Sequence, residues 1–328
     1  MTLVYYGDYN INPYRVKDTR IMNAQLLAVK NEINKVLRGK DDIIDMVLCT
    51  MLAGGHILLE DIPGVGKTTL AVALSRSLGI GYKRMQFTPD VLPSDIVGFS
   101  MYDREKNDFT FKPGAVFTNL FLADEINRTS PKTQAALLEV MEERRVTVES
   151  TTYRLKSPFF VIATQNPTGA SGTQKLPDSQ LDRFFVRLTL GYPDHSAATE
   201  ILKGNSFEAI DTVRRVMDGG SILALQEEAA NVHASDEICD YVVSLSEATR
   251  NTDLLLQGVS PRGSIAILKL ARAYACYEGR DFVVPEDIHR VICPVCNHRI
   301  ILSTKAKAAG KSAEDIITEM LDFVPVPV

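Results

Sequence analysis

The stretch Asp61-Ile-Pro-Gly-Val-Gly-Lys-Thr-Thr69 decides how this chain is expected to fold. The apolar run HILLE at 56–60 precedes it, and the helix-forming run LAVALSRSL at 70–78 follows it. A glycine-rich loop between a strand and a helix places backbone N–H groups and the positive end of the helix dipole around bound phosphates. The alternative is a glycine turn that binds nothing. We therefore predict a phosphate-binding loop at 61–69.

The side chains of this loop predict bound phosphates and Mg²⁺ as its ligands. Lys67 can reach the β- and γ-phosphates, and the Thr68 hydroxyl can hold Mg²⁺. The first position of the GxxxxGK[ST] pattern is Asp61 in place of glycine, which leaves these chemical groups unchanged. The residues expected to bind nucleotide are Asp61, Pro63, Gly64, Val65, Gly66, Lys67, Thr68 and Thr69.

Composition sets broad limits on the class of protein. A chain of 328 residues, 45% hydrophobic and 23% charged, is long enough for about two domains. Its formal net charge of −5 provides no overall attraction to nucleic acid, although a local basic patch would do so. The longest uncharged apolar stretch, 46–59, is too short to cross a bilayer, and the N-terminus does not resemble a secretory signal. Five cysteines without framework spacing indicate a reducing cytoplasm.

The order of predicted elements indicates an α/β core followed by helices. Short β-type runs alternate with helical stretches, which is typical of a parallel sheet covered on both faces. From 197 to 321 only helices are expected, with starts at Ser235, Ser260 and Ser312. We predict an N-terminal extension (1–20), an α/β core (21–194) and a helical domain (195–328). The strands are expected at 56–60, 82–87, 119–123, 159–164 and 184–190, and two hairpins at 99–112 and 146–155.

Acids at the end of a second buried strand complete the predicted chemistry. The run NLFLADE at 119–125 ends in Asp124, which is placed to bind Mg²⁺, and Glu125, which can activate water as a general base. Asn166, after the next strand, could orient that water, although Asn166-Pro167 would also read as a turn. Arg183 and Arg262 could contact phosphate or form ordinary surface ion pairs. Arg262 lies in the first turn of a helix, a position that favours anions.

A single CxxC pair, Cys293 and Cys296, is the other pattern that is typical of metal-binding sites. A structural zinc site needs four ligands, and no second pair exists in the sequence. We expect these cysteines to pack within a helix.

Several linked blocks resemble the MoxR family of AAA+ ATPases. DEINRTSPKTQAALLEVMEERRVTV at 124–148 is similar to the family signature, and similar blocks precede and follow it in the expected order. The resemblance runs from about residue 21 to about 303. It implies an AAA+ P-loop core, a five-stranded αβα sandwich, with a C-terminal helical lid. The other blocks are FTPDVLPSDIVG at 87–98, FFVIATQNP at 159–167, LPDSQLDRF at 176–184 and SPRGSIAIL at 260–268.

The resemblance also implies roles for the residues already singled out. Lys67, Thr68, Asp124 and Glu125 match the Walker A and Walker B motifs, and Glu60 with Asp61 matches the family's version of Walker A. Asn166 matches sensor 1, Arg262 matches sensor 2 on the lid, and Arg183 matches the arginine finger that a neighbouring subunit inserts. The two hairpins correspond to the helix-2 insert and the presensor-1 hairpin, and Arg128 is a candidate contact to the next subunit.

The function implied by the family is Mg²⁺-dependent hydrolysis of ATP by a ring of identical subunits, a hexamer. Such a ring would remodel proteins together with a partner that bears a von Willebrand factor A domain, in the maturation of metal- or cofactor-containing client enzymes. Three alternatives stay open: a chelatase-like motor, a nucleic-acid translocase, and an ATP-dependent switch that does not hydrolyse. The acidic net charge and the hairpin tip EKND at 105–108 speak against the translocase, and Glu125 speaks against the switch.

Overall fold

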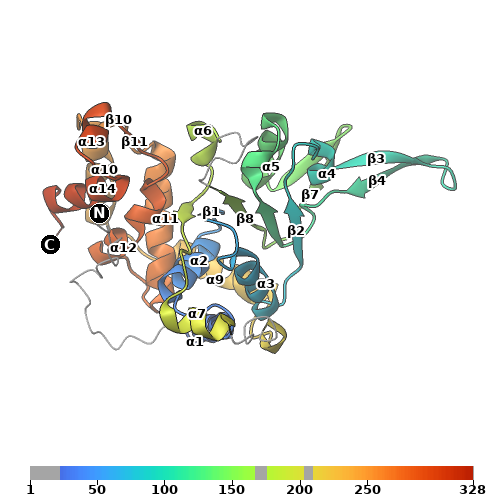
Figure 1. Ribbon diagram of the computed structural model, residues 1–328, viewed down its shortest axis with the longest axis horizontal. Helices are drawn as coiled ribbons and strands as arrows, with labels where there is room; N and C mark the ends of the chain where they lie inside the picture. The colour runs from blue at the N-terminus through green and yellow to red at the C-terminus, as the bar shows by residue number, and fades with distance from the viewer. Residues whose placement is uncertain (1–22, 167–175, 203–209, 328) are drawn as a thin grey trace.

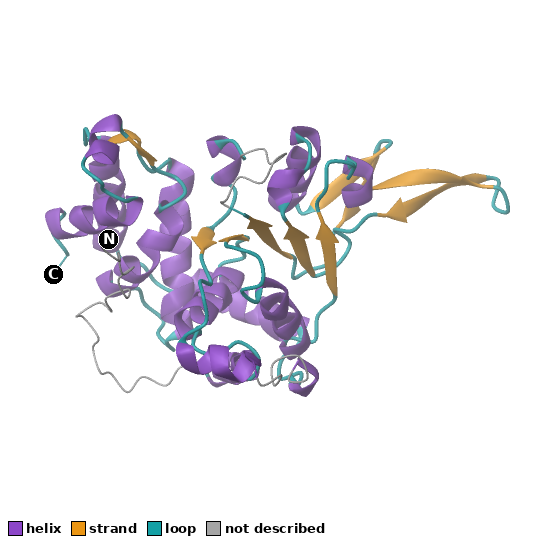
Figure 2. Ribbon diagram, viewed as in Figure 1, coloured by secondary structure: helices purple, strands orange, loops and turns teal. Residues whose placement is uncertain are grey.

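A computed structural model of the chain describes residues 23–166, 176–202 and 210–327. A five-stranded parallel sheet lies at its centre, in the order β2-β5-β8-β1-β9 (Figures 1 and 2). Each strand overlaps one of the stretches predicted from the sequence, so the predicted α/β fold class is confirmed. The strands are β1 (Ile57–Glu60), β2 (Tyr82–Gln86), β5 (Leu120–Asp124), β8 (Phe160–Gln165) and β9 (Val186–Leu188).

Each face of the sheet has its own apolar core. Leu122 and Ile162 pack on one side, whereas Phe121 and Val161 pack on the other, because successive side chains of a strand point to opposite faces. Strands buried on both faces explain continuous apolar runs such as LFLA at 120–123. The first core is completed by α1 (Ala24–Asn34), α2 (Asp41–Leu52) and α3 (Lys67–Ser77), and the second by α4 (Pro93–Val97) and α5 (Pro131–Glu143).

Both predicted hairpins are present. β3 (Gly98–Asp103) pairs antiparallel with β4 (Asp108–Pro113), and Figure 1 shows this hairpin projecting far from the sheet. β6 (Arg145–Val148) pairs with β7 (Thr151–Arg154). The rings of Phe111 and Tyr153 stack with their centroids 3.9 Å apart, so the two hairpins contact each other.

Helices make up most of the C-terminal part, as predicted. The starts predicted at Ser235, Ser260 and Ser312 are confirmed, because each serine side chain accepts a hydrogen bond from the backbone N–H three residues later. None of the described helices is long and apolar enough to cross a membrane. The helices are α6 (Asp178–Leu181), α7 (His195–Leu202), α9 (Gly219–Asn231), α10 (Asp236–Arg250), α11 (Pro261–Tyr277), α12 (Pro285–Cys296), α13 (Thr304–Ala308) and α14 (Ala313–Phe323), with short 3-10 turns at η1 (Ile126–Arg128) and η2 (Ile210–Thr212).

The expectation of helices alone between 197 and 321 is wrong at one place. β10 (Leu255–Gln257) pairs antiparallel with β11 (Ile301–Leu302). Strands this short show no periodicity, and the pairing joins two segments that are distant in the sequence. Local pattern therefore could not reveal it.

The division of the chain at 194 and 195 stays a prediction. Buried residues of α9, α11 and α12 belong to the same apolar core as those of α1, α2 and α3. The lid and one face of the sheet are thus packed together in this structure. The predicted extension at 1–20 lies outside the described residues.

The CxxC pair lies on α12. Burial raises the pKa of both Cys293 and Cys296 to about 12, and both side chains pack in the core that the lid shares with the sheet. Across 23–166, 176–202 and 210–327, no group of three His, Cys, Asp or Glu side chains is placed to hold a metal ion.

Candidate nucleotide-binding and hydrolysis site

The loop after β1 bends at two glycines before α3 begins. Gly64 has a φ of +87° and Gly66 a φ of +102°, a left-handed conformation that L side chains rarely adopt. The first backbone N–H groups of a helix have no partner within it, so the start of α3 offers donors to an anion. Val65 packs against the apolar core, which anchors the loop. Seven of the predicted nucleotide-binding residues form this loop and the first turn of α3: Pro63, Gly64, Val65, Gly66, Lys67, Thr68 and Thr69.

Lys67 lies at the same edge of the sheet as the two acids at the end of β5, because β1, β8 and β5 are parallel neighbours. Its Nζ donates a hydrogen bond to the carbonyl oxygen of Asp61 at 2.9 Å. Burial lowers the pKa of Lys67, and the charges of Asp124, Asp61 and Glu125 oppose that shift. Groups that perturb one another in this way must lie close together. The phosphate loop and the acid pair therefore form one site.

Asp61, the departure from the usual loop pattern, has a structural role in this site. Asp61 is 4% exposed, and its carboxylate accepts hydrogen bonds from the backbone N–H groups of Leu190 and Gly191. The carboxylate thus ties the phosphate loop to the segment after β9, and the carbonyl oxygen of the same residue holds Lys67. The structure does not direct the Asp61 side chain to a ligand, although the sequence pattern placed it among the nucleotide-binding residues.

Asp124 is held from two sides at the carboxyl end of β5. Its Oδ1 accepts a hydrogen bond from Thr164 Oγ1 at 2.6 Å, and its Oδ2 accepts one from Arg84 Nη2, also at 2.6 Å. Thr164 belongs to β8 and Arg84 to β2, the two strands that flank β5 in the sheet. Asp124 is 9% exposed, so these partners are needed to stabilise its charge.

Glu125 adopts a strained backbone conformation that fixes its direction. Its φ is 58° and its ψ 47°, which is unfavourable for a residue other than glycine. The Glu125 N–H donates a hydrogen bond to Thr164 Oγ1 at 2.9 Å, which helps to hold this conformation. The Glu125 carboxylate accepts from Gln86 Nε2 and from Arg128 Nη1, each at 2.8 Å. Arg128, suggested by the sequence as a contact to the next subunit, therefore contacts Glu125, the predicted general base, of its own chain.

The donor set fits Mg²⁺. Thr68 and Asp124 supply oxygen atoms, which Mg²⁺ prefers, and Mg²⁺ in phosphate sites is held by one or two carboxylates together with substrate oxygens. Thr68 follows β1 and Asp124 ends β5, so both predicted metal ligands belong to the carboxyl edge of the parallel sheet. We retain Thr68 and Asp124 as the residues that would hold the ion.

Asn166 lies where the sequence predicted it. It directly follows β8, the strand between β5 and β1 in the sheet, so it lies at the edge that carries the acids and the phosphate loop. Its carbonyl oxygen accepts a hydrogen bond from Asn127 Nδ2 at 3.4 Å. Its role as the residue that orients water stays a prediction, and Pro167 lies outside the described residues.

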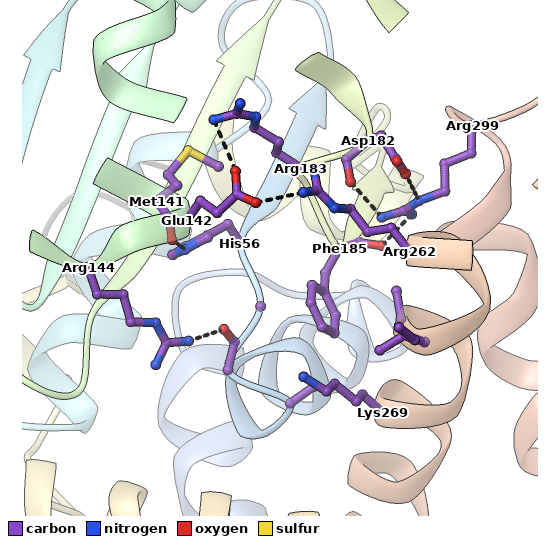
Figure 3. A pocket seen from close by; sticks show the side chains of 15 residues that line it. His56, Met141, Glu142, Arg144, Asp182, Arg183, Phe185, Arg262, Lys269 and Arg299 are labelled. Carbon is purple, nitrogen blue, oxygen red and sulfur yellow. Dashed lines mark hydrogen bonds and ion pairs between the residues drawn. The ribbon is translucent and has the colours of Figure 1, made fainter. Parts of the chain in front are cut away.

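Arg183 and Arg262 lie together (Figure 3), near the residues before β1 and so at a different edge from the phosphate loop, which follows β1. Glu142, at the end of α5, pairs with both: its Oε2 lies 3.2 Å from Arg183 Nη1 and its Oε1 lies 2.6 Å from Arg262 Nη2. The structure does not bring Arg262 to the phosphate loop of its own chain, and its predicted contact with nucleotide stays a prediction. Sequence reasoning missed this because it cannot orient the lid relative to the sheet.

The two arginines line a pocket with a volume of about 290 Å³. Gly54, Gly55 and His56, which precede β1, form part of its wall, whereas the phosphate loop follows β1. The four residues of β1 separate these edges by about 13 Å. Five cationic and two acidic side chains line the pocket, which gives it a net positive charge: Arg144, Arg183, Arg262, Lys269 and Arg299 with Glu142 and Asp182.

His56 holds the wall of this pocket in place. Its Nδ1 accepts a hydrogen bond from the Val161 N–H at 3.0 Å, so Nε2 carries the proton that it donates to the Met141 carbonyl oxygen at 2.9 Å. Both bonds require the neutral ring. Burial lowers the pKa of His56 from 6.5 to about 4. The ring thus joins the last turn of α5, which carries Glu142, to β8.

We expect His56→Gln to reduce the loss of stability in acid. In the wild type, the unfolded chain binds a proton near pH 6.5 and the folded chain only near pH 4, so the contribution of the neutral ring is complete above pH 6.5 and is lost as the pH falls towards 4. At pH 5 this loss amounts to about 2 kcal/mol. Denaturant unfolding at pH 7 and pH 5 measures it. His195→Gln, at an exposed histidine, is the control, and equal losses in His56→Gln and wild type would contradict the assignment.

Three site residues escaped the sequence analysis: Arg84, Gln86 and Thr164. Arg84 and Gln86 are two residues apart on β2 and therefore share one side of that strand. The alternation of side chains along β2 was the only available signal for Arg84 and Gln86. It shows that they share a side of the strand but not which residues they contact. The contacts depend on the pairing of β2 with β5 and of β5 with β8.

The fold and the site define an AAA+ P-loop protein with a helical lid. Residues 56–186 match the family described as ATPase family associated with various cellular activities, and residues 247–320 match the AAA lid domain. A crystal structure of a candidate ATPase from Cytophaga hutchinsonii superposes with a TM-score of 0.86 at 37% identity, over 93% of this chain and 95% of that one.

Relatives over nearly the whole length complete the comparison. The Bacillus subtilis protein YeaC is 48% identical over 90% of this chain and 93% of its own length. Chaperone MoxR1 of Mycobacterium tuberculosis is 38% identical over 90% of this chain and 81% of its own, and Protein MoxR of Paracoccus denitrificans is 34% identical over 93% and 97%. The chain belongs to the MoxR family of AAA+ ATPases, which confirms the resemblance of its sequence blocks.

Proposed function

We propose that this protein hydrolyses ATP to ADP and phosphate in a Mg²⁺-dependent reaction. The observation that carries the proposal is that Lys67, which follows β1, and the acids Asp124 and Glu125, which end β5, belong to the carboxyl edge of one parallel sheet. Ligands of open α/β sheets bind at this edge. The family match at 56–186 supports the same activity.

Each residue has a distinct share in this reaction. Backbone N–H groups of the loop and the start of α3 bind the phosphates, and Lys67 neutralises their charge. Thr68 and Asp124 would hold Mg²⁺, which would supply positive charge to offset that of the phosphates. Glu125 accepts the proton of the attacking water, and Asn166 orients that water. The strained backbone at Glu125 keeps the carboxylate aimed before substrate arrives.

We further propose that Arg183 and Arg262 act together on ATP bound to a neighbouring subunit. Both line the pocket before β1, whereas the phosphate loop follows β1, a strand whose four residues span about 13 Å. They form a paired cationic surface at the rim of a net positive pocket. A triphosphate presented by a second copy of the chain is the anion that this surface suits. The catalytic unit is therefore the contact between two subunits of a ring.

The biological role that we propose is that of a chaperone-like remodeller. Two relatives carry the names Chaperone MoxR1 and Protein MoxR, which supports this class of activity. The finer proposal, inferred from the family, is a hexamer that acts with a von Willebrand factor A domain protein on client enzymes in the cytoplasm. All five cysteines are free thiols, which suits a reducing compartment. A chelatase-like motor or a nucleic-acid translocase would use the same hydrolytic site on a different client.

Turnover per subunit is expected to rise with protein concentration until the ring is complete. An arginine supplied by a neighbour is absent from a free monomer, so the rate should increase more steeply than linearly with concentration. Phosphate release measured over a dilution series, alongside mass by light scattering, tests this. Lys67→Ala is the control, because it should not bind ATP at any concentration. A monomer that hydrolyses ATP at the full rate would contradict the proposal.

A further inference from the structure

A buried arginine of the lid holds the chain on both sides of Arg183 (Figure 3). Arg299 follows α12, and its side chain is only 2% exposed. Its Nη2 donates to the carbonyl oxygen of Phe184 at 2.6 Å, and its Nη1 donates to that of Phe185 at 3.0 Å. On the other side of Arg183, Arg299 Nε donates to Asp182 Oδ1 at 2.7 Å and Nη2 donates to the Asp182 carbonyl oxygen at 3.2 Å. The lid thus fixes the backbone that carries Arg183.

Asp182 joins this arginine to the helix that carries Arg262. The second carboxylate oxygen of Asp182, Oδ2, accepts a hydrogen bond from Ser260 Oγ at 3.0 Å. Ser260 is the N-cap of α11, where its Oγ accepts the Gly263 N–H at 3.1 Å, and Arg262 lies in the first turn of the same helix. One carboxylate therefore touches both the support of Arg183 and the start of the helix that presents Arg262.

Gly263 makes room for this arrangement. A Cβ atom at this position would lie 2.6 Å from Val259 Cγ1 and 3.0 Å from Arg299 Cδ. Any larger residue would collide with Val259 and crowd Arg299. The glycine in the SPRGS block is thus explained by the close packing of Val259 and Arg299 against α11, independently of the hydrogen bonds at Asp182.

The contact of Glu142 with the two arginines is too weak to hold them alone. The side chains of Glu142, Arg183 and Arg262 are 42%, 32% and 47% exposed, and exposed ion pairs contribute about 0–1 kcal/mol. The pair of Asp182 and Arg299 is mostly buried, with side chains 23% and 2% exposed, so it can form a rigid frame.

We propose that Asp182 is a positioning residue that, through Arg299 and Ser260, holds Arg183 and Arg262 side by side as one unit. The inference rests on the proposed action of these arginines on a neighbour's ATP. It predicts that a change at Asp182 weakens hydrolysis at the phosphate loop of the next subunit and leaves ATP binding at the loop of its own chain intact.

Mixed rings test this inference. Arg183→Ala subunits keep a phosphate loop but lack the finger, whereas Lys67→Ala subunits lack the loop but keep the finger. Mixing the two should restore hydrolysis. Adding Asp182→Asn to the Lys67→Ala subunit should lower the restored rate on the order of tenfold, because misplaced catalytic groups lose rate steeply. Adding Asp182→Asn to the Arg183→Ala subunit should cause no such loss, since that subunit presents no finger. A merely structural role would not depend on which subunit carries the change.

Ser260→Ala gives a second, milder variant with a matched control. It removes the bond to Asp182 and the N-cap of α11, whereas Ser235→Ala removes only the N-cap of α10. We expect Ser260→Ala in the Lys67→Ala subunit to reduce the restored rate and Ser235→Ala to leave it unchanged. If Asp182→Asn lowers the thermal stability, the comparison of Ser260→Ala with Ser235→Ala tests the positioning role of Asp182 in its place. Arg299→Ala is unsuitable, because it leaves buried acceptors and Asp182 without partners.

The outcomes separate the inference from the proposed function. If Lys67→Ala subunits fail to restore hydrolysis by Arg183→Ala subunits, the action across the interface is wrong. If they restore it, and folded Lys67→Ala subunits that carry Asp182→Asn or Ser260→Ala restore it equally well, only the role of Asp182 is overturned.

Discussion

Glu125→Gln is expected to bind ATP as tightly as the wild type and to lose turnover by a factor on the order of 10² to 10⁴. The amide has the shape of the carboxylate and can still accept a hydrogen bond from Gln86 or Arg128, the two partners of Glu125. It cannot take the proton of the attacking water. Contacts of the phosphate loop, including that of Lys67 with the Asp61 carbonyl oxygen, do not involve Glu125.

Two measurements separate binding from chemistry in this variant. Titration with a fluorescent ATP analogue gives the dissociation constant, and phosphate release at saturating ATP gives kcat. Glu139→Gln is the matched control, because Glu139 is an exposed glutamate on α5. A kcat of Glu125→Gln equal to that of the wild type would show that Glu125 is not the general base.

The parts of the fold that the sequence predicted are those encoded by local pattern. The strand before Asp61, the loop glycines Gly64 and Gly66, and the helix after them follow one another along the chain. The sequence alone therefore predicts a phosphate-binding loop there. The same holds for β5, where a buried apolar run ends in Asp124 and Glu125. N-cap serines such as Ser260 also act within three residues of their own position. In each case the interaction and its signal are close in sequence.

The parts that the sequence did not reveal depend on which distant segments meet. Asp124 contacts Arg84 and Thr164, each 40 residues away, because β2, β5 and β8 are neighbours in the sheet. The pairing of β10 with β11 is of the same kind. Arg299 could not be singled out among the arginines, since its importance comes from burial against Asp182 and not from any motif.

Arg262 shows that a motif can predict a residue on a lid helix without predicting which phosphate loop that residue meets. The sequence block SPRGSIAIL at 260–268 predicted an arginine at the start of a lid helix. The structure agrees, because α11 begins with Pro261 and Arg262. Whether such a helix covers its own phosphate loop or the opposite edge of the sheet depends on how the lid packs. In this structure α11 packs against α2 and α9 within the shared core, which places Arg262 beside Glu142. No local pattern carries that information.

Arg183→Ala is expected to keep ATP affinity and to lose turnover by about 10³-fold or more, the range found for arginine fingers. Its guanidinium lies at the pocket edge, away from the loop that binds ATP in its own chain. Arg183→Lys should recover only part of the rate, because an ammonium cannot form the two-pronged contact of a guanidinium. Arg145→Ala, which removes an exposed arginine paired with Glu143, is the control for loss of surface charge.

Arg262→Ala, like Arg183→Ala, should reduce hydrolysis at the phosphate loop of the neighbouring subunit. Both arginines pair with Glu142 and point into one pocket. In rings mixed from Arg183→Ala and Lys67→Ala subunits, we expect Arg262→Ala to reduce hydrolysis when the Lys67→Ala subunit carries it, since that subunit supplies the arginines. On the Arg183→Ala subunit, which supplies the loop, it should have little effect. The reverse pattern would mean that Arg262 moves to the phosphate loop of its own chain when ATP binds, and that the lid rotates far from the position that α11 occupies here.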